Sequence, residues 1–277
     1  ELKKIKTTGD KILDVPLAKV GGKGLFVKEI EDALLSHKVD LAVHSMKDVP
    51  TDLPEGLHIA SVTEREDPRD ALLARGGCKM MELPHHAKIG TSSLRRQAQI
   101  LSVRSDFEIN QLRGNLDTRI KKLETKELDA VILAAAGIRR MGWTDKITEY
   151  ISTDVCLPAI GQGAVGIETR VDDEAINSLV LRLNHETTSL AVRAERAFLK
   201  KLEGGCQVPI AAYGEINGDK VKLRGLVGRI DGSEIIKDSL EGSVERVEEI
   251  GDELAEKLLS MGAGEILKEV YDLTISP

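Results

Sequence analysis

One cysteine of this 277-residue chain stands in a setting that favours a displayed thiol. Cys206 follows Gly204 and Gly205 and precedes Gln207 and Pro209, directly after a stretch with helical periodicity. Glycine permits backbone conformations that other residues avoid, and proline cannot continue a helix. A thiol in such an irregular turn is a candidate covalent attachment point. The same pattern also fits a helix C-cap followed by an ordinary loop cysteine, so the stretch alone leaves both interpretations open.

Arginines and hydroxyls gather in the middle of the chain. The net charge is −7, yet residues 88–122 carry eight basic and three acidic residues, whereas residues 238–272 carry three basic and eleven acidic ones. Thr91, Ser92 and Ser93 precede a predicted helix whose first turn holds Arg95 and Arg96. Cations at a helix N-terminus oppose the helix dipole, so this pattern predicts a bound anion there. The bidentate fork of arginine favours a polycarboxylate or a phosphate as that anion.

Further polar residues follow predicted strands. Lys47 and Asp48 come after a buried strand at residues 40–44, where α/β sheets usually place their ligands, although a solvated turn pair has the same pattern. Arg119 lies on a helix after residues 113–115 and is either an anion ligand or an exposed helix residue. Of Arg139 and Arg140, either one could face a cleft.

Composition limits the class of protein. No apolar run approaches the ~20 residues that span a membrane, and an aromatic content of 3% argues against stacking on nucleic acid bases. The three cysteines have no metal-ligand spacing, so we expect no metal site and a reducing cytoplasmic location.

The order of predicted elements indicates an α/β protein. Strands at residues 88–90, 108–112 and 129–134 alternate with helices, which predicts a mostly parallel sheet. A charged segment at residues 65–70 and a glycine-rich one at residues 157–167 would be two crossings between two lobes with a cleft between them. Asp231-Gly232 predicts a hairpin within a small α+β domain. The predicted domains comprise residues 1–64 with 164–182, residues 69–157, and residues 185–277.

Seven stretches, in order and spanning essentially the whole chain, resemble the porphobilinogen deaminase family, also called hydroxymethylbilane synthases. The resemblance implies two periplasmic-binding-protein-like lobes and a third domain. It also implies a transferase that joins four porphobilinogen units with loss of ammonia and releases hydroxymethylbilane for tetrapyrrole (haem) biosynthesis. The matching stretches are residues 17–26, 44–50, 65–70, 90–97, 112–115, 157–164 and 203–209.

The resemblance assigns roles to single residues. Cys206 would hold a dipyrromethane cofactor through a thioether, and Asp48 would be the catalytic carboxylate that stabilises the azafulvene cation left when ammonia departs. Cys78 lies in no matching stretch and is interpreted as an incidental loop thiol, and Cys156 as a packing residue. The implied cofactor-binding residues are Ser45, Lys47, Asp48, Thr91, Ser92, Ser93, Arg95, Arg96, Arg113, Gly114 and Cys206. The implied substrate-binding residues are Lys19, Lys23, Arg119, Arg140 and Gln162.

Family members open with Gly-Ser/Thr-Arg-x-Ser-x-Leu-Ala, which does not occur in this sequence. Either this segment belongs to the protein outside this sequence or it is absent. If it is absent, we expect a first domain without that strand and helix, and weak or no turnover. The resemblance otherwise implies a cytoplasmic monomer that binds neither nucleic acid nor membrane. Two other classes compete with it. One is a non-catalytic two-lobed binding protein for a polycarboxylate, and the other is a cysteine-dependent transferase with His185 as its base.

Overall fold

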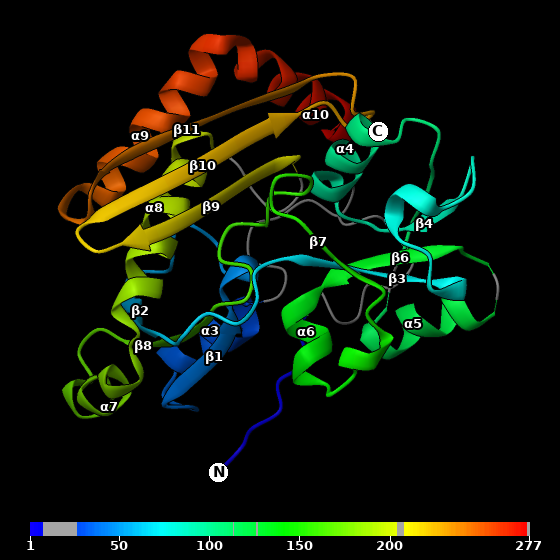
Figure 1. Cartoon of the computed structure of the whole chain (residues 1–277). Helices are drawn as coiled ribbons and strands as arrows, with labels where there is room; N and C mark the ends of the chain where they lie inside the picture. The colour runs from blue at the N-terminus through cyan, green and yellow to red at the C-terminus, as the bar shows by residue number, and fades with distance from the viewer. Residues whose placement is uncertain (8–26, 113, 126, 204–207, 276–277) are drawn as a thin grey trace.

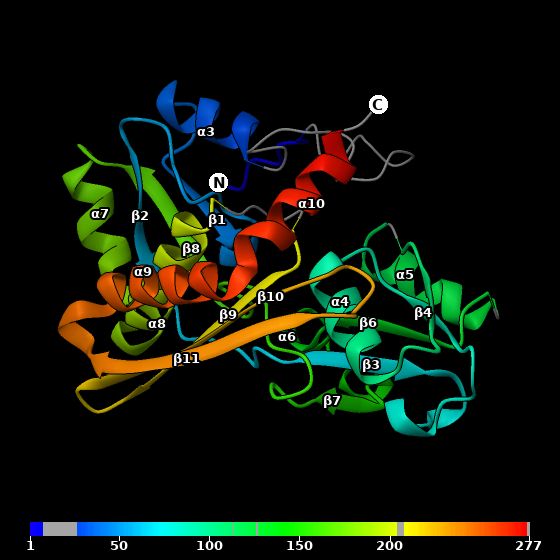
Figure 2. The same cartoon turned by 90° about the horizontal axis from the view of Figure 1, so that it is seen from above.

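Three β-sheets organise the chain in a computed structural model that describes residues 1–7, 27–112, 114–125, 127–203 and 208–275. Two sheets belong to two α/β lobes, and the third belongs to a small C-terminal α+β unit (Figure 1). Seen from above, the lobes lie on opposite sides, and the third sheet reaches from one to the other (Figure 2). The predicted domain boundaries themselves stay predictions.

The first lobe contains an antiparallel sheet of order β1-β8-β2. Alternate residues of β1 point to opposite faces, so Ala42 and His44 are buried while Leu41 and Val43 are exposed. Leu34 of the covering helix packs against Ala42. The elements of this lobe are α3 (Lys28–Leu35), β1 (Leu41–Ser45), β2 (Leu57–Val62), β8 (Val165–Arg170) and α7 (Glu174–Val180).

The second lobe contains a five-stranded sheet of order β5-β4-β6-β3-β7. β4 runs parallel to β5 and β6, as the alternation of strands and helices predicts, but β3 runs antiparallel to β6 and β7. The parallel pairing expected of the strands at residues 88–90, 108–112 and 129–134 is therefore confirmed, and β3 alone among the five strands runs against the others. β3 is reached through a crossing between the lobes rather than through a βαβ unit. The elements are β3 (Asp70–Ala74), β4 (Lys88–Gly90), α4 (Leu94–Val103), β5 (Glu108–Asn110), α5 (Leu116–Glu124), β6 (Ala130–Ala134), α6 (Ala135–Arg140) and β7 (Glu149–Ile151).

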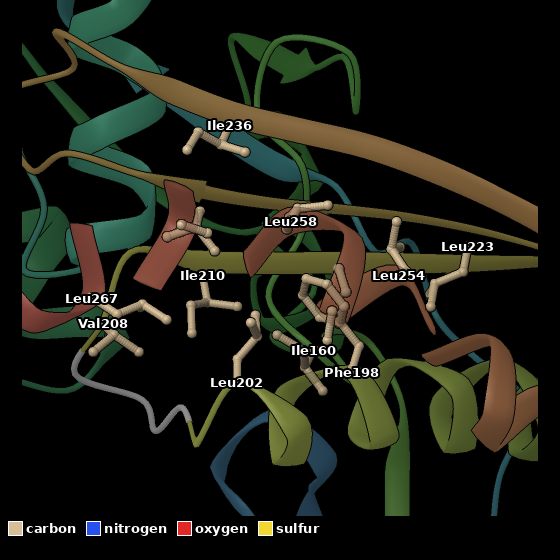
Figure 3. Close-up of a cluster of buried hydrophobic side chains, with 14 of the residues drawn as sticks. Ile160, Phe198, Leu202, Val208, Ile210, Leu223, Ile236, Leu254, Leu258 and Leu267 are labelled. Carbon is tan, nitrogen blue, oxygen red and sulfur yellow. The ribbon is translucent and has the colours of Figure 1, made fainter. Parts of the chain in front are cut away.

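The C-terminal unit is a three-stranded meander of order β11-β10-β9 against three helices. The predicted hairpin at Asp231-Gly232 is confirmed, because residues 229–234 join β10 to β11. Phe198 and Leu254 enter the apolar cluster on one face of this sheet (Figure 3). The elements are α8 (Glu186–Lys201), β9 (Ile210–Asn217), β10 (Lys220–Gly228), β11 (Ile235–Ser243), α9 (Val247–Leu258) and α10 (Gly264–Ile275).

Short helical turns complete the described chain. Among the residues that the structure describes, no helix has the length and apolar character needed to cross a membrane. The turns are η1 (Met46–Asp48), η2 (Arg75–Gly77), η3 (Met80–Glu82), η4 (Thr144–Lys146), η5 (Leu181–Leu183), η6 (Val244–Arg246) and the π-type turn η7 (Leu259–Ala263).

The two segments that join the lobes lie side by side. The Thr63 amide donates to the Val165 carbonyl at 2.9 Å, and the Glu66 amide donates to the Gly163 carbonyl at 3.2 Å. Gly163 has a φ of +90°, and a β-carbon there would lie 2.4 Å from the Glu66 carbonyl oxygen. The close pairing of the crossings therefore requires glycine at this position.

The fold generates one stability prediction. Phe198 is fully buried between α8, α9 and β10, so Phe198→Ala should lower the free energy of unfolding by about 3–5 kcal/mol through lost burial and a cavity. Urea unfolding measures this change. Leu181→Ala is the control, because Leu181 is 60% exposed, and its effect should stay within about 0.5 kcal/mol. Equal midpoints for the two variants would contradict the assigned core.

Candidate active site

Lys47 and Asp48 are positioned by the end of β1. The strand ends at Ser45, and η1 then turns the chain with Met46 as its anchor, because Met46 is 2% exposed and its amide donates to the Ala164 carbonyl at 3.0 Å. Lys47 is half-buried and Asp48 is exposed. The turn thus presents an ammonium and a carboxylate at the edge of the first lobe, as the sequence predicts.

The electrostatic neighbours of Lys47 belong to both lobes. Burial lowers the pKa of Lys47, and Asp48 opposes this shift. Arg96, Asp70 and Arg95 of the second lobe act on the same ammonium group. The fold therefore brings the turn after β1 close to the start of α4, although these residues are about fifty positions apart in the chain.

Asp70, the first residue of β3, is the centre of a buried polar cluster. Its carboxylate accepts hydrogen bonds from Arg95 Nη1 at 2.8 Å and from Arg96 Nε at 2.9 Å and Nη2 at 2.7 Å. Gln162 Nε2, from the second crossing, donates to it at 3.0 Å. Asp70 is 0% exposed, and burial alone would raise its pKa, but the two guanidinium groups hold that pKa well below its usual range.

The anion that the sequence predicts beside Arg95 and Arg96 is thus present within the chain. Sequence reasoning missed Asp70, because residues 65–70 read as a charged hinge. All three guanidinium nitrogens of Arg96 are engaged, since Nη1 also donates to the Ile132 carbonyl at 3.1 Å. Arg95 differs from it. Its Nε is buried and has no hydrogen-bond partner within the described part of the chain. Ligand binding by Arg95 stays a prediction.

Gln162 braces the crossings. Its side chain is held by two bonds, because Nε2 donates to the Pro68 carbonyl at 2.7 Å as well as to Asp70. Its own carbonyl accepts from Arg65 Nε at 2.9 Å. The residue is 1% exposed. The side-chain amide nitrogen is thus used in joining the two crossings, and a role of Gln162 in substrate binding stays a prediction.

The three hydroxyls before α4 shape the turn that carries Arg95 and Arg96. Ser93 caps the helix, and its hydroxyl accepts from the Arg96 amide. Ser92 Oγ both donates to the Leu112 carbonyl and accepts from the Leu112 amide, each at 2.9 Å. Thr91 is buried and accepts from the Ser93 amide at 3.2 Å. Their further use as donors to a ligand stays a prediction.

Gly114 and Arg119 form one unit at the start of α5. Gly114 has a φ of +105°, and Arg119 Nε donates to its carbonyl at 2.7 Å. The Arg119 guanidinium is therefore drawn back to the N-terminal loop of its own helix, where a ligand could meet it. This geometry places it toward the turn rather than on the outer helix surface.

The neighbouring arginines of α6, Arg139 and Arg140, each contact a different one of the two crossings. Arg140 Nη2 donates to the Gly163 carbonyl at 2.9 Å, and Arg139 Nε lies 3.0 Å from a Glu66 carboxylate oxygen. Arg140 is exposed, so its remaining donors can serve a ligand. Its role in substrate binding stays a prediction.

A second buried carboxylate, Glu195 of α8, was also missed by sequence reasoning. It is 0% exposed, pairs with Arg65 of the first crossing, and accepts from the Gly161 amide at 2.7 Å and the Gly214 amide at 2.9 Å. Glu195 therefore ties both crossings and β9 to one helix. The available signal was a glutamate on the helix face that also carries Ala191, Val192 and Phe198.

Four predicted site residues, Lys19, Lys23, Arg113 and Cys206, lie outside the described residues. The chain on both sides of Cys206 is anchored, since Leu202 and Val208 are each 4% exposed and point into the same apolar cluster (Figure 3). The Tyr271 hydroxyl donates to the Glu203 carbonyl at 2.9 Å.

The structure describes the surroundings of Cys156, Cys78 and His185. Burial raises the pKa of Cys156 to about 12, and its thiol contacts Asp70, which agrees with a packing role. Cys78 is half-buried. His185 bonds to Thr188 at the N-terminal end of α8, a 16-residue helix about 24 Å long, whereas Cys206 follows its C-terminal end. Among the described residues, no group of three or more potential ligands could hold a metal.

These features define a three-domain protein with two α/β lobes of periplasmic-binding-protein-like plan and a small α+β domain. Residues 1–178 match the porphobilinogen deaminase dipyromethane cofactor binding domain, and residues 189–260 match the porphobilinogen deaminase C-terminal domain. The chain belongs to the porphobilinogen deaminase family.

Named relatives agree with this assignment. Porphobilinogen deaminase of Geotalea uraniireducens is 60% identical over 275 residues, which cover 99% of this chain and 86% of the relative. The enzyme of Geobacter metallireducens is 59% identical over 276 residues, with 100% and 86% covered. Among solved structures, an arginine-specific periplasmic binding protein of Salmonella typhimurium is similar with a TM-score of 0.34 and 15% identity, covering 58% of this chain and 71% of that chain. Nothing further follows from so low a similarity.

The Asp70 cluster generates a pH-dependent prediction. Asp70→Asn should lower the free energy of unfolding by about 3–5 kcal/mol, because it leaves two buried guanidinium groups without their anion. The folded-state pKa of Asp70 lies below its usual 3.8, so its stabilisation is complete above that value and is lost as the pH falls through the lower folded-state pKa.

Urea unfolding from about pH 8 to pH 3 measures this difference. The gap between wild type and Asp70→Asn should be constant above about pH 5 and shrink below about pH 4. Asp145→Asn is the control, because Asp145 is an exposed carboxylate of the same lobe. A gap that is absent at neutral pH would count against the buried ion-pair cluster.

Proposed function

We propose that this chain is a hydroxymethylbilane synthase, a transferase that joins four porphobilinogen molecules head to tail with loss of ammonia. The family assignment and the high identity to named enzymes favour this function over a non-catalytic binding protein. The structural observation that carries the proposal is the meeting of Lys47 and Asp48 with the Asp70–Arg95–Arg96 cluster across the two lobes.

The donors at this meeting point suit a dipyrromethane cofactor, whose acetate and propionate groups need cations and hydrogen-bond donors. Arg95 offers its buried, unpartnered Nε, and Lys47 offers an ammonium group beside it. We propose that these two residues, with Ser45, hold the cofactor carboxylates, and that Cys206 attaches it through a thioether. When bound, the cofactor supplies the pyrrole carbon to which the first substrate unit is joined.

The proposed chemistry needs one carboxylate at the reacting centre. The C–N bond of the substrate aminomethyl group breaks, ammonia leaves, and a cation develops on the substrate pyrrole. The exposed Asp48 carboxylate would stabilise that cation and accept a hydrogen bond from its pyrrole N–H. A fixed anion stabilises a developing positive charge best beside a low-dielectric part of the protein. A C–C bond then forms, and a proton leaves the attacked pyrrole carbon.

Cations from several elements would neutralise the lengthening product. Every added unit brings two carboxylates, so binding requires more positive charge than Lys47 and Arg95 supply. We propose that Arg119 and Arg140 bind substrate carboxylates, with Lys19, Lys23 and Arg113. A monomeric, cytoplasmic enzyme remains the expectation from the sequence.

Attachment of the cofactor is tested by the intact mass of the denatured protein. Wild type and Cys78→Ala should carry a mass excess of two condensed pyrrole units, whereas Cys206→Ala should not, because its thiol is absent. Where wild type carries no excess, incubation with porphobilinogen should create it. An adduct that persists in Cys206→Ala would refute the assigned attachment site.

The role of Asp48 is tested by turnover of a variant. Asp48→Asn should lower kcat by about 10²–10³-fold, because the amide cannot offset the developing cation. Turnover is compared in preparations whose adduct has been verified by mass, so that loss of primer is not mistaken for loss of catalysis. Glu55→Gln, an exposed carboxylate of the same lobe, should retain wild-type turnover. Full activity of Asp48→Asn would overturn the assignment.

A further inference from the structure

A cleft of about 780 Å³ lies between the second lobe and the C-terminal sheet. One wall is the surface of β10 and β11, and the other is the C-terminal half of α4 with residues 153–157. The end of the β10–β11 hairpin lies beside α4 in both views (Figures 1 and 2). The volume of the cleft is within the range of ~300–1,000 Å³ that small-molecule sites occupy.

Strand register determines which side chains face this cleft. In the antiparallel pair, Arg224 lies opposite Ser239, and Leu226 lies opposite Lys237. Opposed residues point to the same face, as do residues two apart along a strand. All four therefore share one face. Asp238 also lines the cleft, although its side chain belongs to the opposite face and pairs there with Lys257 at 2.8 Å.

The cleft is closed at both ends by specific contacts. At one end, Gly232 of the hairpin turn packs so tightly on α4 that a β-carbon would lie 2.4 Å from the Ser102 amide nitrogen. At the other end, Arg224 donates to Asp154 and to Thr153 Oγ1, each at 2.8 Å. These contacts join the two walls of the cleft at its two ends.

The lining combines an apolar body with two cations, of which Arg224 is paired with Asp154 at 2.8 Å and with Glu215 at 3.6 Å. Arg224 Nε is buried and has no hydrogen-bond partner in the described ranges, although its Nη atoms are engaged. Lys237 is exposed and takes part in none of the ion pairs found among the described residues. Aliphatic side chains make up much of the remaining lining, namely Val103, Val155, Leu157, Leu226 and Ile235.

The cleft is separate from the proposed active site but shares a wall with it. Gln99 lines the cleft and exchanges hydrogen bonds with Leu157, at 3.1 Å from Nε2 to the carbonyl and 2.7 Å from the amide to Oε1. On the far side, the same Leu157 carbonyl accepts from Arg95 Nη1 at 2.7 Å. A molecule in the cleft would therefore contact the two residues that hold Arg95.

We propose that this cleft binds a small amphipathic carboxylate, with its apolar body against the aliphatic wall and its carboxylate toward Lys237. The site joins two domains, so an occupant also stabilises their contact. Binding here requires neither turnover nor the cofactor, and a failure of the proposed function would leave the test intact.

The test uses two probes, indole-3-acetate and 4-phenylbutyrate, with indole-3-acetamide as the neutral control. Ligand-observed NMR at millimolar probe concentration should detect both carboxylates and not the amide. Lys237→Glu should weaken binding at least about tenfold. Lys222→Glu is the matched control, because Lys222 is exposed on the same sheet face but outside the cleft, and it should bind as wild type does.

Three outcomes would overturn the proposal. The first is no binding of either carboxylate, and the second is equal binding by wild type and Lys237→Glu. The third is binding that is lost in Lys47→Met but kept in Lys237→Glu, which would place the probes at the proposed active site instead.

Discussion

The arrangement of the two lobes depends on the buried carboxylate of Asp70. An unpaired charge in a protein interior is strongly unfavourable, so Asp70 and the guanidinium groups of Arg95 and Arg96 must meet for any of them to be buried. Asp70 begins β3, directly after the first crossing, while both arginines begin α4. Their pairing therefore fixes the start of the second lobe's main helix beside the point where the chain enters that lobe.

Glu195 is a second buried and paired carboxylate, and it lies where the crossings meet the third domain. It accepts from Arg65 and Gly161, one residue from each crossing, and from Gly214 of β9. The buried carboxylates of Asp70 and Glu195 thus both contact the crossings. Gln162 links them, because its side chain donates to Asp70 and its carbonyl accepts from Arg65, the partner of Glu195. Hydrogen bonds to a buried charge are directional and costly to break, so the junction has a defined geometry. That geometry brings Lys47 and Asp48 toward the second lobe.

Local patterns predicted the elements better than the partners. The helix that begins after Ser93, the buried strand before Lys47 and the Asp231-Gly232 hairpin follow from rules that involve neighbours in the sequence, and the structure contains all three. The antiparallel direction of β3, the contacts of Gln162 with both crossings and the identity of the anion at Arg95 as Asp70 did not follow from such rules. Each depends on a residue brought close only by the crossings.

The sequence by itself determined the family, the α/β class and the identity of the chemistry-bearing residues, because motifs and hydrophobic periodicity are written along the chain. Only the tertiary structure decided which charges neutralise one another and which remain for a ligand. Arg95 and Arg96 are adjacent and alike in sequence, yet only Arg95 retains a buried donor without a partner among the described residues. The reason is physical, since Coulomb interaction and desolvation depend on distance and burial in space, and no spacing along a chain specifies either.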